Sequence, residues 1–322
     1  MSLTSIIIPT HNRPHLLFRA VESARAAGTN IEVIVVDDAS TDETATVCKT
    51  LRGIKYVRAE HNQGVAGARN IGLLASSGEY VTFLDDDDQR LPNSLDEQVK
   101  LLEIDKHAGL VYGQAILGDQ SGKPTNEIYP LACPQGDTFW DLLRQNFIPC
   151  GSAVFRRSSL NCVGLSDSTI PGLDDWDLWI RIAELYPVIA LEKPVVIWRR
   201  STPVSGQGSS QAADIVSEAV RQFRQWWIKL PRAANAPSQM RRVAWRYFSA
   251  NMAAHLIWEA IRSLRLGEMR QATKNTLALS RLGPLALVRL VRQRGRLLRT
   301  IIGQARKTSA SYSDSISRPV EP

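Results

Sequence analysis

Short apolar runs in the first third of the chain end in polar or acidic side chains, and they constrain the fold more than any other feature. Residues 5–9, 31–36 and 80–84 are rich in apolar and β-branched side chains, a composition typical of buried strands. A run at 55–58 predicts a further strand, and apolar residues at helical spacing predict helices over 14–26 and 67–75. A Ser-x-x-Glu capping box at 40–43 predicts another helix that begins there. This alternation predicts an α/β domain with a mostly parallel sheet.

Polar groups follow three of these runs, at the points where the strands are expected to end. They occupy residues 9–12, the pair 37–38 and the aspartate tetrad 85–88. Parallel sheets bind ligands beyond the carboxyl ends of their strands, so we expect these groups to share one edge. Adjacent carboxylates repel one another unless a cation neutralises them, and hard divalent ions prefer carboxylate oxygen. The tetrad therefore predicts a site for a divalent ion and phosphate oxygens, with a solvated acidic loop as the alternative.

A second acidic cluster, Asp174 and Asp175, opens a helical pattern later in the chain. Metal-assisted transfer from a nucleotide diphosphate needs groups for the base and ribose, an ion at the departing diphosphate, and a base for the acceptor. Asp38 is suited to hydrogen bonds with the nucleotide, and Arg69 to offsetting charge near the diphosphate. The aspartate pair is the candidate source of the catalytic base. The alternative is that the pair only caps the helix, because Asp is common at helix N-termini.

Charge is divided unevenly along the chain. Residues 1–209 carry 19 Lys and Arg against 26 Asp and Glu, whereas residues 210–306 carry 18 against 4. We therefore expect one domain over 1–205, a basic helical accessory region over 206–306 and a disordered Ser- and Pro-rich tail over 307–322. The four cysteines form no C-x-x-C pair, which favours a reducing compartment. No run approaches the roughly 18–20 apolar residues of a membrane span, so we expect a cytoplasmic protein.

Five motifs occur in one order within residues 4–205, and together they resemble the family 2 glycosyltransferases, inverting enzymes with the GT-A fold. They lie at 8–13, 36–42, 67–70, 83–88 and 174–181. The resemblance implies a Rossmann-like GT-A domain that takes a sugar from a nucleotide-diphosphate sugar, in the first instance a UDP-sugar. It also implies a glycan or lipid-linked acceptor and a role in making surface polysaccharides.

The resemblance also implies roles for single residues. Pro9 and Asp38 would contact the nucleotide base. Asp87 would be the main ligand of a Mn²⁺ or Mg²⁺ ion in a D-x-D element, and Asp175 would be the catalytic base. The other expected contacts of the nucleotide sugar are Thr10, Asn12, Arg69, Asp85 and Asp86. The chain departs from the family pattern twice: Asp174 replaces the usual Glu, and the metal motif is D-D-D-D where D-x-D-D is commoner.

Two other classes of protein deserve comparison with this interpretation. A nucleotidyltransferase of related fold would open with a Gly-rich, basic loop after its first strand, and residues 9–12 contain none. A nucleic-acid-binding protein would use the basic half, with aromatic side chains interleaved among exposed basic residues. The aromatic residues of that half fall mainly on apolar helical faces, so we expect no nucleic-acid partner.

The segment 285–302 has the pattern of a basic amphipathic helix. Six apolar residues share one side, and four arginines lie opposite: Arg289, Arg292, Arg296 and Arg299. Such helices bind in the headgroup region of anionic membranes. We therefore expect peripheral attachment to the cytoplasmic face of a membrane, the alternative being a helix packed on its own domain.

Overall fold

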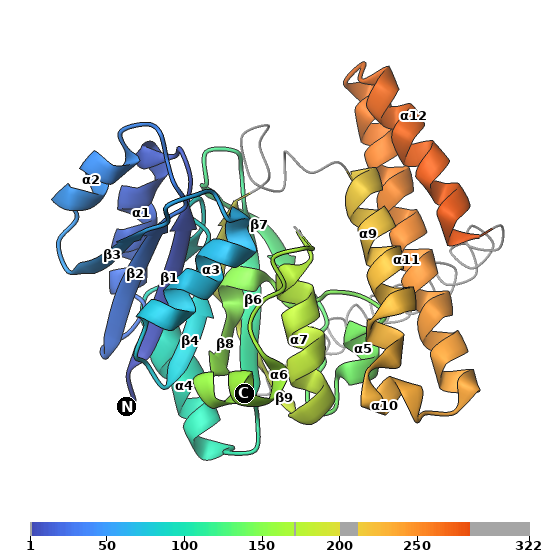
Figure 1. Ribbon diagram of the computed structural model, residues 1–322, viewed down its shortest axis with the longest axis horizontal. Helices are drawn as coiled ribbons and strands as arrows, with labels where there is room; N and C mark the ends of the chain where they lie inside the picture. Colours follow the sequence, from blue (N-terminus) through green and yellow to red (C-terminus); the bar gives the residue numbers. More distant parts are fainter. Residues whose placement is uncertain (1, 171, 200–211, 284–322) are drawn as a thin grey trace, which may run out of the picture. The chain divides into compact units, whose positions relative to one another are not determined.

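The computed structural model describes residues 2–170, 172–199 and 212–283 (Figure 1). The chain forms two compact units, Met1–Pro237 and Ser238–Pro322. The first unit extends beyond the boundary that we expected near residue 205. It includes α9 (Ala212–Gln225), η3 (Trp227–Lys229) and α10 (Pro231–Ala234).

Within the described residues, nine strands form one sheet in the order β3-β2-β1-β4-β8-β6-β9-β5, with β7 paired to β6. Their bounds are β1 (Thr4–Thr10), β2 (Ile31–Asp37), β3 (Ile54–Arg58), β4 (Tyr80–Phe83), β5 (Gln89–Arg90), β6 (Leu110–Gly118), β7 (Pro124–Tyr129), β8 (Ala153–Arg156) and β9 (Val188–Arg199). The first four strands in this order are parallel, as expected. Beyond them the sheet is mixed, because β8 runs antiparallel to both β4 and β6.

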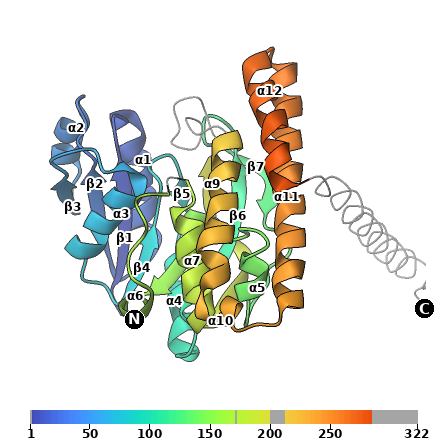
Figure 2. The ribbon, with the colours of Figure 1, turned by 45° about the vertical axis from the view of Figure 1, so that its right-hand side comes forward.

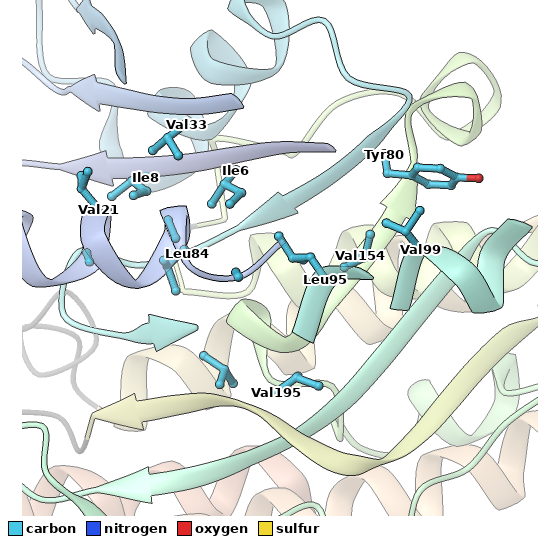
Figure 3. Close-up of a cluster of buried hydrophobic side chains, with 14 of the residues drawn as sticks. Ile6, Ile8, Val21, Val33, Tyr80, Leu84, Leu95, Val99, Val154 and Val195 are labelled. Atoms are coloured by element: carbon cyan, nitrogen blue, oxygen red, sulfur yellow. The ribbon is translucent and has the colours of Figure 1, made fainter. Parts of the chain in front are cut away.

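Helices cover both faces of the sheet because successive strand residues point to opposite sides. Ile6 and Ile8 of β1 face α1 (Pro14–Arg25) and α4 (Ser94–Ile104), where they join one buried cluster (Figure 3). Ile7 faces α3 (Gly64–Ala75), and a side chain at Gly72 would collide with it. Further helices of the first unit are α2 (Thr44–Thr50), η1 (Cys150–Ser152), η2 (Arg157–Ser159), α5 (Phe139–Leu142), α6 (Leu160–Val163) and α7 (Asp174–Leu185).

The prediction of a capping box at residues 40–43 is wrong. Helix α2 begins at Thr44, whose backbone N–H donates to Asp42 Oδ1 at 2.9 Å. The Ser40 hydroxyl instead accepts the backbone N–H of Asn12 at 2.9 Å. A tertiary hydrogen bond from the loop after β1 therefore engages the side chain that was expected to cap the helix.

The second unit is a helical hairpin of α11 (Ser238–Arg265) and α12 (Met269–Ala278), followed by η4 (Leu279–Leu282) (Figures 1 and 2). The helical character of this region was predicted, and Gly267 adopts a positive φ of 75° at the turn between the two helices. The expected basic helix at 285–302 and the expected tail at 307–322 lie outside the described residues. Over the part of the chain that the structure describes, no helix is both long and apolar enough to span a bilayer.

Candidate functional site

The carboxyl ends of β1, β2 and β4 bring the predicted polar groups to one edge of the sheet. Thr10 pairs with Asp37 in the parallel register of β1 and β2. The Thr10 hydroxyl donates to Asp86 Oδ2 at 2.7 Å, and the backbone N–H of Asp38 donates to the Thr10 carbonyl at 2.9 Å. Pro9 is buried in the same stretch of β1. Residues from three strands therefore meet, as the order of elements predicted.

The two aspartates that follow β2 have different surroundings. Asp37 is fully buried and accepts hydrogen bonds from Ser40 N–H, Tyr56 O–H and Arg58. Burial alone would raise the pKa of Asp37, but these donors outweigh it and hold the pKa below its ordinary value. Asp38 accepts the backbone N–H of Gln63 at 2.7 Å, and burial leaves its pKa raised. Asp37 therefore stabilises the fold, and Asp38, which is also buried, accepts backbone N–H groups at the start of α3 (Gly64–Ala75).

The loop after β1 is held by polar contacts. Asn12 adopts a positive φ of 53°, and its side-chain oxygen accepts the Thr41 N–H at 2.8 Å. Arg13, which the sequence analysis did not single out, places Nη1 3.0 Å from Asp86 Oδ1. Burial raises the pKa of Asp86 to about 7, although Arg13 opposes the shift. Arg13 is the last residue of the motif at 8–13, and that motif is the sequence signal that places it at this edge.

Asp87 and Asp88 face different partners. Asp87 lies between two guanidinium groups, 3.9 Å from Arg13 and 4.0 Å from Arg199. Asp88 is buried and accepts the backbone N–H of Arg199 at 2.9 Å. Burial and the neighbouring Asp85 raise the pKa of both carboxyl groups. Asp88 thus anchors the end of β9, while Asp87 remains the more accessible of the two.

The donor set at Asp85 and Asp87 fits a hard divalent ion. Both are carboxylates, both keep accessible surface, and Asp85 raises the pKa of Asp87 by like-charge repulsion that a cation would relieve. In the described residues, no three His, Cys, Asp or Glu side chains converge as a metal-binding group. Mg²⁺ in nucleotide enzymes typically takes only one or two protein carboxylates and completes its shell with phosphate and water. A full protein cage is therefore not required here.

Arg69 of α3 joins the strand edge to the start of α7. Its guanidinium is buried and lies 2.6 Å from Asp174 Oδ2 and 2.6 Å from Asp85 Oδ1. Burial disfavours the charged form, yet Cys150, Asp85 and Asp174 hold the pKa of Arg69 well above its ordinary value. The predicted contact between Arg69 and a diphosphate stays a prediction. The observed contacts give Arg69 a bridging position between the two acidic clusters.

Asp175 lies in the first turn of α7, as the sequence predicted. Its Oδ1 accepts the Trp176 backbone N–H at 2.6 Å. Burial, with the negative charge of Asp174, raises the pKa of Asp175 to about 7, and Arg69 acts in the opposite direction. A carboxylate with a pKa near neutrality can both accept and release a proton at physiological pH.

Helix α7 is held in place by segments on either side. Trp176 donates its indole N–H to the Leu142 carbonyl at 2.8 Å. Asp177 accepts the indole N–H of Trp227 at 2.8 Å, and the rings of Trp176 and Trp227 lie 5.0 Å apart. The segment that includes α9 and η3 thus packs directly on the helix that carries Asp175. The sequence analysis did not identify Trp227, because nothing near residue 227 in the sequence points to Asp177.

Comparisons with known proteins identify the family and the fold. The sequence model of Glycosyl transferase family 2 matches residues 5–164. The chain is 31% identical over 186 residues to the Escherichia coli protein named UDP-Glc:alpha-D-GlcNAc-diphosphoundecaprenol beta-1,3-glucosyltransferase WfgD, covering 56% of this chain and 69% of that protein. It is also 31% identical over 221 residues to an uncharacterized glycosyltransferase of Rickettsia felis, covering 66% of this chain. The chain spans only 36% of that relative's length.

Two solved structures share the fold. A crystal structure of S. aureus TarS 1–349 in complex with UDP-GlcNAc has a TM-score of 0.60 at 17% identity, covering 89% of this chain and 83% of that one. The mannosyltransferase PcManGT from Pyrobaculum calidifontis, in complex with GDP-Man and Mn²⁺, has a TM-score of 0.54 at 20% identity, covering 89% and 87%.

Proposed function

This chain belongs to glycosyl transferase family 2 and has the GT-A fold, and from that premise we propose that it is an inverting glycosyltransferase. The donor is a nucleotide-diphosphate sugar, with UDP-glucose the first to test because a similar enzyme is named for it. The acceptor is a sugar carried on a lipid diphosphate, the class of acceptor in that enzyme's name. We also propose that the enzyme transfers the sugar at the cytoplasmic face of a membrane.

The strand edge is the donor side of the proposed site. Asp38 accepts hydrogen bonds from the nucleotide base, next to Pro9, and Thr10 and Asn12 shape the loop beside it. Asp86 faces the ribose. Asp87, with Asp85, would hold Mn²⁺ or Mg²⁺, which when bound offsets negative charge on the departing diphosphate. The support is the convergence of these groups on one edge and the like-charge repulsion between Asp85 and Asp87.

Asp175 is the proposed catalytic base. The observation that carries the proposal is the difference between Asp175 and its neighbour Asp174. Asp174 is tied to Arg69 by a buried ion pair, so Asp175 is the member of the pair that is available for a proton. In the transfer step the acceptor oxygen bonds to the anomeric carbon on the face opposite the leaving group. The bond to the diphosphate oxygen breaks with its electron pair, and the acceptor proton passes to Asp175. A single displacement of this kind inverts the anomeric configuration.

The test is transfer from UDP-sugars to a synthetic GlcNAc-diphosphate-lipid, with Mn²⁺ or Mg²⁺ added. We expect an inverted product by NMR and loss of most turnover in Asp87→Ala, because the diphosphate charge is then less compensated. Asp214→Ala removes an exposed carboxylate on α9 and serves as the matched control. Full activity of Asp87→Ala in EDTA, or a product with retained configuration, would contradict the proposal.

A further inference from the structure

Large apolar side chains gather on the surface at one end of the helical hairpin. Of the sixteen exposed large apolar residues in the described chain, five lie between residues 258 and 269. The run 264–270, which spans the turn from α11 to α12, is exposed at every position. Leu266 and Met269 are 64% and 62% exposed, and Leu277, two turns further along α12, is 67% exposed. These side chains form an apolar strip along α12 that the hairpin itself leaves uncovered.

The hairpin does not need these residues for its own packing. The buried positions of α12 are Ala272, Asn275 and Ala278, which lie three residues apart on the other side of the helix. Ala253 and Ala260 of α11 are buried as well, together with the larger Leu256. The buried side of α12 thus carries small and polar side chains, whereas its long apolar side chains Met269 and Leu277 are exposed.

Basic residues flank the apolar strip on α12. At 100° per residue, Arg270 and Lys274 of α12 fall beside Leu277 within a narrow arc, and Arg281 follows in η4. Glu268, the acidic residue nearest in sequence, lies at the N-cap just before α12. Residues 238–283 carry eight Lys and Arg against two Asp and Glu. We call the set Leu266, Met269, Arg270, Lys274, Leu277 and Arg281 the α12 face.

We propose that the α12 face docks on the surface of an anionic lipid bilayer. Leu266, Met269 and Leu277 enter the boundary between headgroups and acyl chains, and the three basic side chains reach the lipid phosphates. A second copy of the chain is a poorer occupant, because two such faces would repel each other. This inference deepens the proposed function, since a lipid-linked acceptor lies in a bilayer, and it concerns a part of the chain other than segment 285–302.

The test is co-sedimentation of the full-length protein with vesicles of phosphatidylcholine alone or mixed with phosphatidylglycerol. We expect binding to the mixed vesicles at low salt and little to the neutral ones. Arg270→Gln with Lys274→Gln should weaken binding about 25-fold, at about fivefold for each basic residue near an anionic surface. Leu266→Ser with Met269→Ser and Leu277→Ser should weaken it by roughly tenfold or more. All of these side chains are exposed, so circular dichroism and the Tm should match those of the wild type.

A matched control carries Arg52→Gln with Leu131→Ser, which removes one exposed basic and one exposed apolar side chain from the first unit. It should bind vesicles like the wild type. Equal binding by the wild type and both α12-face variants would overturn the inference, and would assign any binding to other parts of the chain. Absence of wild-type binding, or a dimer in ultracentrifugation that the variants break, would overturn it too. Sedimentation needs no donor sugar, so its outcome is independent of the transfer assay.

Discussion

Two pairs of adjacent aspartates, one after β2 and one at the start of α7, are built alike but differ in what surrounds the second carboxylate. In both pairs the first member is buried and tied: Asp37 to Tyr56 and Arg58, and Asp174 to Arg69. In the proposed site, the second member of each pair, Asp38 or Asp175, is the one that would contact a ligand. The two pairs would then share a division between a structural and a functional carboxylate.

The difference lies in how the charge of the second member is compensated. Asp38 receives backbone N–H groups at the start of α3, which oppose the rise in its pKa. Asp175 receives one backbone N–H, and burial, with the negative charges of Asp174 and Asp85, raises its pKa to about 7. Asp38 suits a binding role that needs a stable anion, and Asp175 suits a proton acceptor. The surroundings of each pair, and not the residue type, separate the two roles.

The largest expected effect is that of Asp175→Asn on turnover. Loss of a general base typically costs about 10²–10⁴-fold in rate, so kcat should fall by that factor while UDP binding by calorimetry stays close to wild type. Asp214→Asn is the control, because it removes an exposed carboxylate outside the site. A near-normal kcat for Asp175→Asn would contradict the comparison, because Asp175 would then not be the base and would differ little in role from Asp38.

Asp174→Asn tests whether the first member of the α7 pair is structural. It leaves the buried Arg69 guanidinium with one carboxylate in place of two, and breaking a buried ion pair costs about 3–5 kcal/mol of unfolding free energy. Urea unfolding followed by fluorescence measures the loss. Asp141→Asn is matched to it, because it breaks a partly exposed ion pair with Arg144 and should cost about 1 kcal/mol or less. Equal costs for the two variants would show that burial does not distinguish Asp174.

The pH dependence of kcat/KM tests the contrast between Asp38 and Asp175. The base must be unprotonated, so activity is present above the Asp175 pKa of about 7 and falls about tenfold per unit as the pH drops below it. Asp85→Asn removes a neighbouring negative charge and should move this limb to lower pH. Asp38→Asn should leave its position unchanged, although donor binding weakens. The assignment of this acidic limb to Asp175 would be wrong if Asp38→Asn shifted the limb, or if Asp85→Asn left it in place.

Much of the site was predictable because its signals are local in the sequence. The apolar runs identified β1, β2 and β4, and their polar ends placed Thr10, Asp38 and the tetrad at one edge. The start of α7 was likewise expected at Asp174. The failed prediction at residues 40–43 is instructive, since Ser40 has the right neighbours for a cap but bonds to Asn12, 28 residues away.

The sequence by itself determined the alternation of strands and helices, the edge where the carboxylates gather and the division between an acidic front and a basic back. Only the tertiary structure decided which carboxylates are tied. Arg69 reaches Asp174 across 105 residues of chain, and Arg13 reaches Asp86 across 73. Hydrophobic periodicity acts between residues a few positions apart and can be read along the chain. The pKa of a carboxyl group depends on burial and on charges that folding brings together from distant segments.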